Sequence, residues 1–387
     1  MADGRIFVSG GHIAGHTGIT ALNIFDPATE AWSVMPEMAF PRWYPTATIL
    51  PDGRFIVLSG ETNCNDCDVT TPEIFDPVAK SWTQLTDSQF FFSFYPHAFV
   101  LPDGRLLVSS TIESSTVSQV LDLGTGKWTP IGGPAVDGGS AVMYLPGKVL
   151  KTGKSLDPDD QVTPSTATAY VLDATQASPT WQAAAPMNAP LSYHNLTLLP
   201  DGTVLVTGGG PTTAATDTAN ATLNPEIWSP ETQTFTALTS TMSAPRLYHF
   251  SAQLMPDGRV LVTGGGRYND TSAPSDQFSS EFFAPPYLFK GPRPVITTAP
   301  STLQYGQTFA VQTPDAAKIG KVSLLRYGAT THTVNMAQRY LLLTFTAGAG
   351  ALTVTAPANK NIAPPGNYML FIVDTNGIPS VSTTVHF

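Results

Sequence analysis

Residues 42–60 of the chain read Arg-Trp-Tyr-Pro-Thr-Ala-Thr-Ile-Leu-Pro-Asp-Gly-Arg-Phe-Ile-Val-Leu-Ser-Gly. A mostly apolar strand leads into the Pro-Asp-Gly turn, and a second apolar strand leaves it before a glycine. This order is typical of an antiparallel hairpin that reverses at a tight turn. Similar turns recur along the chain, beginning at Asp3, Asp52, Asp103, Asp201 and Asp257, with a degenerate copy at Pro146-Gly147. The chain is therefore built from a repeated unit.

The repeat has a period of roughly 50 residues and a constant internal order. A glycine or a glycine cluster follows most hairpins, and then a further strand such as residues 73–77. Most cycles close on a tryptophan, at Trp32, Trp82, Trp128 and Trp181. This period, with paired glycines and a late tryptophan, is typical of a kelch-type β-propeller in which each cycle forms one four-stranded blade.

Six cycles are visible, and the first begins directly at its turn, Met1-Ala2-Asp3-Gly4. That cycle therefore lacks the innermost strand that precedes the turn in every other cycle. We expect a propeller that is incomplete at the N-terminus, with its ring open or distorted where an inner strand edge is left exposed.

The repeat ends near Tyr287, and residues 290–294 (Lys-Gly-Pro-Arg-Pro) form a stiff linker because proline fixes the backbone direction. The remaining sequence alternates apolar and polar side chains in short runs between Gly, Pro and Asn. This pattern is typical of an immunoglobulin-like β-sandwich. The sequence therefore predicts an all-β protein with a kelch propeller over residues 1–291 and a β-sandwich over residues 292–387.

The composition excludes several classes of partner. Only 12% of the residues are charged, and 29 acidic against 19 basic side chains give a net charge of −10. An acidic protein is a poor ligand for nucleic acid or for an anionic membrane surface. No apolar run approaches the roughly 20 residues that span a bilayer.

The only two cysteines, Cys64 and Cys67, lie three residues apart in a polar loop. A zinc site would need further soft ligands, and a redox pair would need a helix start; the loop offers neither. We expect a local disulfide in a secreted protein, with which the Asn-x-Ser/Thr acceptors at Asn195, Asn220 and Asn269 are compatible.

One position of the repeat carries an aromatic phenol again and again. Tyr44, Tyr95 and Tyr193 each precede the aspartate of the next turn by 8 residues, and Tyr248 precedes it by 9. Equivalent positions of a propeller gather around one axis, so phenols and imidazoles from distant parts of the chain should meet there. The sequence thus predicts a metal site near the propeller axis.

Three separated motifs in this order resemble the galactose oxidase and glyoxal oxidase family of copper radical oxidases. They are Arg42-Trp43-Tyr44-Pro45, Arg246-Leu247-Tyr248-His249, and Arg326-Tyr327-Gly328 with Thr331-His332-Thr333-Val334-Asn335. The resemblance covers essentially the whole chain and implies a propeller of the seven-bladed kind. It also implies that copper is held by two tyrosines and two histidines, one of them on a hairpin of the C-terminal domain.

Carried onto this sequence, the resemblance implies that Tyr44 is the equatorial ligand that carries the tyrosyl radical. Tyr248 would be the axial ligand and proton acceptor, and His249 and His332 the two imidazole ligands. A nitrogen and oxygen ligand set suits Cu(II), and a phenol close to a cation loses its proton more readily. Trp43 either caps the radical tyrosine or fills the core.

One element of the family pattern is missing. The resemblance implies that the radical tyrosine is joined by a thioether to a cysteine upstream of Met1, and neither Cys64 nor Cys67 matches that position. We therefore expect this chain alone to bind copper weakly and to oxidise poorly, and we expect an upstream extension that carries the cysteine to raise activity.

The other side chains at these positions have simpler interpretations. Tyr95 and Tyr193 are expected to pack the channel mouth. The resemblance implies that neither His97 nor His194 binds copper, and His194 is expected to lie next to the ligands without binding the metal. Arg42 and Arg246 either orient the substrate or pair with carboxylates.

Two functions remain open. The first is a secreted, monomeric, copper-dependent oxidase closer to the glyoxal oxidase branch, which converts small aldehydes or primary alcohols, carbohydrates among them, and reduces O2 to H2O2. The second is a non-catalytic kelch propeller that binds carbohydrate or protein, since the fold alone does not determine the function.

Overall fold

The computed structural model describes residues 1–155, 163–266 and 275–387. Among these residues no α-helix occurs, and the regular structure consists of β-strands and four short 3-10 turns. The predicted all-β class is confirmed. None of the helical turns in these ranges has the length and apolar character that crossing a membrane requires.

Six antiparallel sheets of three or four strands follow one another along the described propeller part of the chain. The first contains β1 (Ile6–Ser9), β4 (Leu22–Asp26) and β5 (Ala31–Val34). The second contains β6 (Thr46–Ile49), β7 (Phe55–Leu58), β8 (Glu73–Asp76) and β9 (Ser81–Gln84), and the third β10 (Ala98–Val100), β11 (Leu106–Val108), β12 (Gln119–Asp122) and β13 (Lys127–Pro130). The fourth contains β14 (Ser140–Leu145), β15 (Lys148–Thr152), β16 (Ala169–Asp173) and β17 (Gln182–Ala183). The fifth contains β18 (Asn195–Leu198), β19 (Val204–Thr207), β20 (Glu226–Ser229) and β21 (Thr234–Ala237), and the sixth β22 (Ser251–Leu254), β23 (Val260–Thr263) and β24 (Ser280–Phe283).

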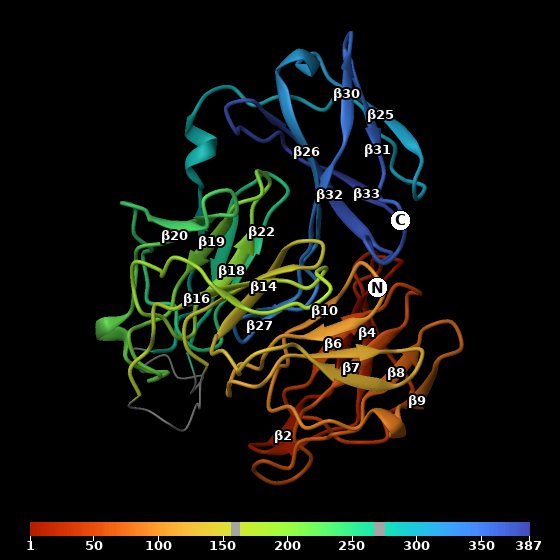
Figure 1. Cartoon of the computed structure of the whole chain (residues 1–387), viewed down its shortest axis with the longest axis vertical. Helices are drawn as coiled ribbons and strands as arrows, with labels where there is room; N and C mark the ends of the chain where they lie inside the picture. The colour runs from red at the N-terminus through yellow and green to blue at the C-terminus, as the bar shows by residue number, and fades with distance from the viewer. Residues whose placement is uncertain (156–162, 267–274) are drawn as a thin grey trace.

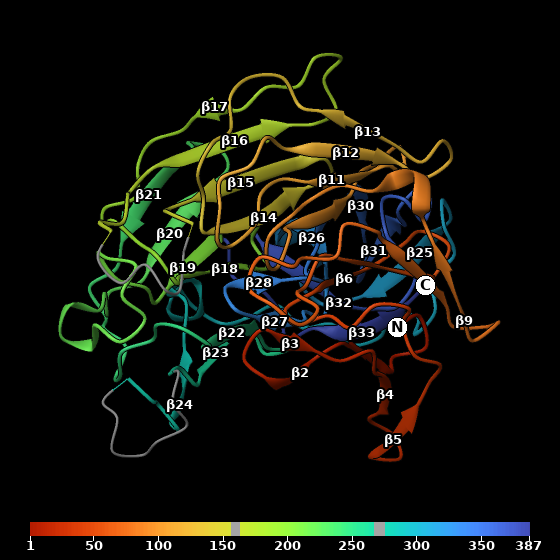
Figure 2. The ribbon, with the colours of Figure 1, turned by 90° about the horizontal axis from the view of Figure 1, so that it is seen from below.

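These sheets are arranged as the blades of an open arc. Figure 2 shows β4 and β5 at one end of the arc, β22 to β24 at the other, and the remaining sheets between them. The first sheet has three strands, as expected, and β1 is its inner edge, with Ile6 and Val8 exposed. The sixth sheet also has three strands among the described residues, one fewer than the repeat predicts.

The Pro-Asp-Gly turns have the geometry that their residues require. In the β6–β7 hairpin, Gly53 adopts a φ of 88° and donates its N–H to the carbonyl of Leu50 over 3.0 Å. Glycine is favoured there because this left-handed conformation is costly for residues with a Cβ. The carboxylate of Asp52 accepts hydrogen bonds from the backbone N–H and the guanidinium of Arg54. The same bonds recur in three other turns, between Asp3 and Arg5, Asp103 and Arg105, and Asp257 and Arg259.

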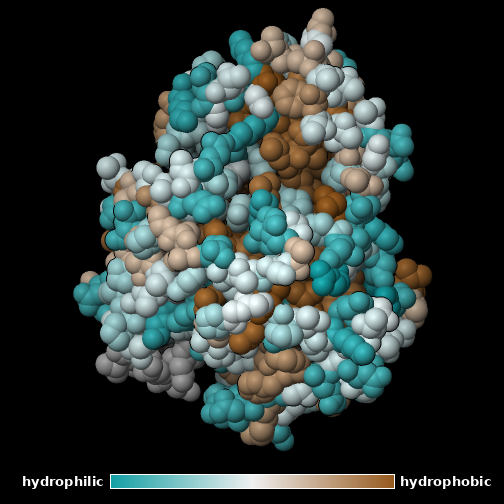
Figure 3. Space-filling view, in the orientation of Figure 1, coloured by the Kyte–Doolittle hydropathy of each residue, from teal (hydrophilic) through white to brown (hydrophobic). Residues whose placement is uncertain are grey.

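The C-terminal part forms two facing sheets. One contains β26 (Ile319–Arg326), β29 (Tyr340–Leu343), β32 (Asn367–Asp374) and β33 (Thr383–His386), and the other contains β25 (Thr308–Gln312), β30 (Phe345–Gly348) and β31 (Ala351–Thr355). Their inner side chains share one apolar core that includes Val322, Leu324, Leu352 and Leu370. This is the predicted sandwich, and the boundary at residues 291/292 stays a prediction. Figure 3 shows that the face in view is largely hydrophilic, with apolar side chains gathered over these sheets at the top.

A hairpin of the C-terminal part reaches into the propeller. It consists of β27 (Thr330–Thr331) and β28 (Val334–Asn335), which lie among the inner strands β14, β18 and β22 (Figure 1). Thr333, between the two strands, donates its hydroxyl to the carbonyl of Gly139 and accepts a hydrogen bond at its own carbonyl from Ser140, both over 3.0 Å. This insertion carries His332 to the centre of the arc.

Candidate metal centre

The tyrosines of the repeat occupy a strained backbone position just ahead of each inner strand. Tyr44, Tyr95 and Tyr193 have φ values of 64°, 46° and 62°, in a region that residues with a Cβ rarely adopt. In the sixth blade this conformation belongs to His249, with φ of 65°, and not to Tyr248. His249 stands 8 residues before Asp257, so it is the true repeat equivalent of Tyr44. The sequence spacing of 9 for Tyr248 already contained this signal.

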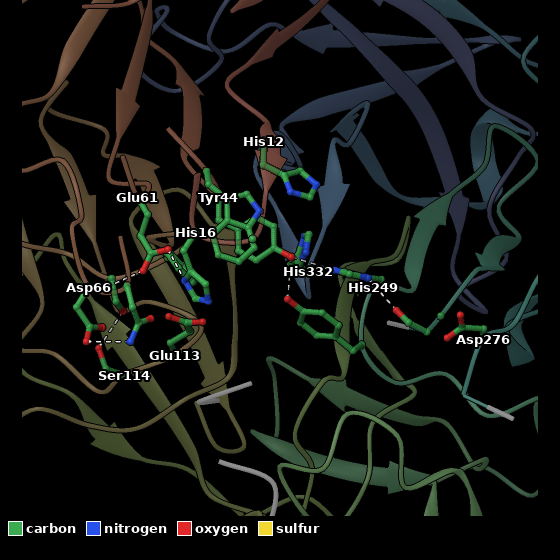
Figure 4. Close-up of a pocket in the computed structure, with 18 of the residues that line it drawn as sticks. His12, His16, Tyr44, Glu61, Asp66, Glu113, Ser114, His249, Asp276 and His332 are labelled. Atoms are coloured by element: carbon green, nitrogen blue, oxygen red, sulfur yellow. Dashed lines mark hydrogen bonds and ion pairs between the residues drawn. The ribbon is translucent and has the colours of Figure 1, made fainter. Parts of the chain in front are cut away.

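The structure brings the four predicted ligands together. The hydroxyl of Tyr248 donates to the hydroxyl of Tyr44 over 3.0 Å, and the Tyr44 hydroxyl lies 3.2 Å from Nε2 of His249. The ring of His332 lies 4.4 Å from the rings of both Tyr44 and His249, and 5.3 Å from that of Tyr248. Figure 4 shows Tyr44, His249 and His332 converging in this way.

Each imidazole is oriented by its other ring nitrogen. Nδ1 of His249 lies 2.8 Å from the carbonyl of Gly266, so it carries the proton and leaves Nε2 as an acceptor facing the phenols. Nδ1 of His332 lies 2.7 Å from the hydroxyl of Thr331. Among the described residues, Nε2 of His332 is buried and has no hydrogen-bond partner. A buried polar atom without a partner is costly, and a metal ion bound by a deprotonated Nε2 would satisfy it.

Burial sets the protonation states of the centre. It lowers the pKa of His332 well below the ordinary value, with a further contribution from His249, so the ring is neutral and able to bind a metal. Burial, and then the neighbouring phenol of Tyr44, raise the pKa of Tyr248 far above its usual range. Without a cation the Tyr248 phenol therefore keeps its proton, and a bound cation would favour its phenolate.

The chemistry of the donors fits copper better than a harder or softer metal. Two imidazole nitrogens and two phenol oxygens form a mixed nitrogen and oxygen set, which suits Cu(II). In the described part of the chain no group of three or more His, Cys, Asp and Glu side chains could hold a metal ion. A metal centre at this place would therefore have to include the phenols of Tyr44 and Tyr248.

Trp43 covers one side of the cluster. Its ring lies 4.3 Å from the ring of Tyr44 and 5.3 Å from that of Phe94. It also lines the pocket above the centre. Of the two interpretations of Trp43, this position favours the one in which it caps Tyr44.

The remaining tyrosines of the repeat pack around the cluster. The ring of Tyr95 stacks on that of His332 at 4.5 Å, and the buried hydroxyl of Tyr193 donates to the carbonyl of Thr213 over 2.8 Å. Neither hydroxyl belongs to the group formed by Tyr44, Tyr248 and His249. The stacking on His332 nevertheless places the ring of Tyr95 directly beside the candidate metal centre, and not only at the channel mouth.

Arg42 and Arg246 pair with carboxylates and do not line the pocket. The fully buried guanidinium of Arg42 binds Glu73 over 2.8 Å and two backbone carbonyls, and Arg246 binds Glu281 over 3.2 Å. Both side chains hold the segments that carry Tyr44 and Tyr248 against their own blades. The structure therefore favours the ion-pair interpretation over substrate binding.

His97 and His194 are buried in the neutral form. Nε2 of His194 lies 2.7 Å from the hydroxyl of Thr152, whereas both ring nitrogens of His97 are without a hydrogen-bond partner among the described residues. Burial lowers the pKa of each ring to about 3, and Lys151 contributes to the shift of His97.

This burial predicts a loss of stability in acid. Because the folded pKa lies below the unfolded value of about 6.5, the unfolded chain binds more protons between about pH 6.5 and pH 3. The contribution of each neutral histidine to the stability of the fold is fully present above about pH 6.5. Below that pH, we expect the free energy of unfolding to fall by up to about 1.4 kcal/mol per pH unit for each histidine. Urea denaturation between pH 4.5 and 7.5 measures this slope. His97→Gln should show a smaller slope than the unchanged protein, and an equal slope would contradict the assignment.

A large pocket opens above the centre. Its volume is about 1050 Å³, and it is lined by all four candidate ligands together with aromatic and polar side chains from several blades. The polar side chains are His12, His16, Glu61, Asn65, Asp66, Ser93, Glu113, Ser114 and Asp276 (Figure 4). The sequence patterns did not identify this set. Most of its members lie in loops between strands, where the repeat gives no signal.

Cys64 and Cys67 form a disulfide in the loop that follows β7, as expected. Since the chain has no other cysteine, no free thiol is present in these 387 residues.

Two family models match the chain. The model described as glyoxal oxidase N-terminus matches residues 141–287, and the model described as galactose oxidase-like, early set domain, matches residues 293–387.

Individual relatives align along almost the whole chain. A galactose oxidase of Gibberella zeae is 30% identical over 411 residues, which cover 99% of this chain and 59% of the relative. An aldehyde oxidase, GLOX, of Vitis pseudoreticulata is 27% identical and is covered over 80% of its length. The solved structure of a fungal alcohol oxidase of the AA5 family, in complex with copper, superimposes with a TM-score of 0.86 at 26% identity and covers 100% of this chain and 83% of that one. The chain thus spans about three fifths of the length of the galactose oxidase it matches.

Proposed function

The chain belongs to the galactose oxidase and glyoxal oxidase family of copper radical oxidases, and we propose that it oxidises primary alcohols or aldehydes with O2. An alcohol RCH2OH and O2 would give the aldehyde and H2O2, and a hydrated aldehyde would give the carboxylic acid and H2O2. One observation carries the proposal: two phenols and two imidazoles meet at the floor of a pocket, where a buried nitrogen of His332 lacks a protein partner.

In this proposal copper is held by Tyr44, Tyr248, His249 and His332. The copper and a radical on Tyr44 would each accept one of the two electrons that the oxidation removes from the substrate. The position of His249 supports its part, because the Gly266 carbonyl fixes its tautomer so that Nε2 faces the two phenols.

Tyr248 is proposed to accept the proton of the substrate hydroxyl. Tyr248 lines the pocket and its hydroxyl is hydrogen-bonded to that of Tyr44, so a proton that reaches this hydroxyl lies one hydrogen bond from the proposed radical-bearing side chain. Its pKa in the metal-free centre is raised by burial, and the cation would lower it into a useful range. Trp43 would shield the Tyr44 ring from water and small reductants.

The thioether of the family is not formed by the cysteines of this chain, because Cys64 and Cys67 are joined to each other. We retain the proposal of a secreted monomer with a domain boundary at residues 291/292. The disulfide supports an oxidising compartment.

The test is to titrate the purified protein with Cu(II) to saturation and to assay peroxide with a panel of primary alcohols and aldehydes. Saturation at about one copper ion per chain, with peroxide formed only in its presence and at a low rate, is the expected result. The non-catalytic propeller would be supported instead if the chain bound carbohydrate or protein on its faces, bound no copper and formed no peroxide. Copper that binds with equal affinity after the Tyr44, Tyr248, His249 and His332 side chains are replaced would contradict the site.

A further inference from the structure

The pocket contains a second organised group that the copper site does not use. His16 lies in the turn between β2 (His12–Ala14) and β3 (Thr17–Gly18), with a φ of 57°. Its Nδ1 lies 2.7 Å from a carboxylate oxygen of Glu61. The imidazole is 38% exposed toward the pocket, whereas the Glu61 side chain is only 1% exposed. Figure 4 shows this pair on the pocket wall opposite His249.

Glu61 is built to hold that imidazole in one orientation. One carboxylate oxygen takes His16, and the other accepts the backbone N–H of Asp66 over 2.7 Å. The backbone of Glu61 pairs with that of Trp43 through two hydrogen bonds of 2.8 and 2.9 Å. A buried carboxylate bound to Nδ1 fixes the tautomer, so Nε2 of His16 is left as the polar atom that can serve the pocket.

The pair is also fixed relative to the copper site. The rings of His16 and Trp43 meet edge to face with their centroids 4.7 Å apart. The centroid of the Trp43 ring in turn lies 4.3 Å from that of Tyr44. His16 is therefore two ring contacts away from the proposed radical tyrosine. Gly18 makes the approach possible, because a Cβ there would lie only 2.7 Å from backbone atoms of Arg42 and would collide with the carbonyl of Glu61.

We propose that His16 is a specificity-determining residue that binds a second hydroxyl group of the substrate, several bonds from the carbon that is oxidised. The proposal rests on the oxidase function proposed above. A hydroxyl group donates and accepts at once, so it can pair with the Nε2 of an oriented imidazole. Glu61 acts through His16 and is a positioning residue.

The charge of the pocket limits the class of substrate. Its described lining contains no lysine or arginine, and its acidic side chains are Glu61, Asp66, Glu113 and Asp276. Away from the proposed copper site, an anionic substrate would meet these carboxylates with no basic side chain of the described lining to offset them. The pocket therefore prefers an uncharged molecule with more than one hydroxyl group to a carboxylate-bearing one.

The first experiment needs neither copper nor activity. Glycerol and propan-1-ol share a three-carbon skeleton and differ in their additional hydroxyls. We expect glycerol to shift the Nε2 resonance of His16 saturably in metal-free protein labelled with ¹⁵N-histidine, and propan-1-ol to leave it in place. The resonance is assigned by its loss in His16→Gln. Equal shifts with both alcohols, or no shift with either, would overturn the proposal.

Kinetics of the copper-loaded protein provide the second arm. His16→Gln should raise KM for glycerol about tenfold, the effect of one lost hydrogen bond, with kcat changed less than threefold and KM for propan-1-ol unchanged. Glu61→Gln should give the same selective change, and His386→Gln, on the distant β33, serves as the matched control.

The outcomes separate the two proposals. A lower melting temperature for His16→Gln with the glycerol preference intact would mean that the pair only fastens the turn, and would overturn the role of His16. A glycerol-specific NMR shift in a protein that makes no peroxide with copper would support the binding role and remove the oxidase function.

Discussion

Tyr44→Phe is expected to lower copper-dependent peroxide formation by at least about 10³-fold, a loss typical of removing a residue that takes part in the chemical step. The substitution removes a single oxygen atom, the one that lies 3.0 Å from the Tyr248 hydroxyl and 3.2 Å from Nε2 of His249. It keeps the ring that packs against Trp43 and His332. The fold should therefore persist, and the measurement is peroxide release per bound copper.

Tyr193→Phe is the matched control for this change. It deletes a buried hydroxyl from the same repeat position in another blade, where the partner is the carbonyl of Thr213. We expect it to cost about 1 kcal/mol of stability, through one lost hydrogen bond, and to leave peroxide formation nearly unchanged. Equal losses in both variants would indicate that the tyrosines support the fold and not the chemistry.

The repeat positions of this protein could be predicted well because they depend on local chemistry. The turn at Asp52 and Gly53 requires a carboxylate and a residue that tolerates positive φ, and both requirements are visible in the sequence. Repeat phase brings Tyr44 close to the Tyr248-His249 pair, although His249 and not Tyr248 is the repeat equivalent of Tyr44. The sequence does not predict that His249 takes the strained position of the sixth blade unless the spacing is measured from that residue.

The side chains that depend on contacts between blades were harder to predict. His332 was identified only through the family resemblance, because nothing in its hairpin indicates that the hairpin enters the propeller. His16 and Glu61 lie 45 residues apart, on a turn and a loop that differ from blade to blade. Their pairing depends on how two insertions of the repeat meet, and a repeat pattern carries no information about that contact.

His332→Ala is expected to weaken copper binding by at least about 100-fold. Removing a ligand should cost more affinity than removing a residue that only supports a ligand. Its Nε2 is buried and has no hydrogen-bond partner among the described residues, so the metal-free protein bears a cost that copper would relieve.

For the unchanged protein, copper at 100 times its Kd should add about 2.7 kcal/mol to the free energy of unfolding. The variant should lose nearly all of this gain at the same copper concentration. Its metal-free stability should change less than a cavity alone would predict, because a buried nitrogen without a hydrogen-bond partner has been removed. Thermal and urea denaturation with and without copper measure both effects without any reference to activity, and a copper-dependent stabilisation that survives the substitution would place the metal elsewhere.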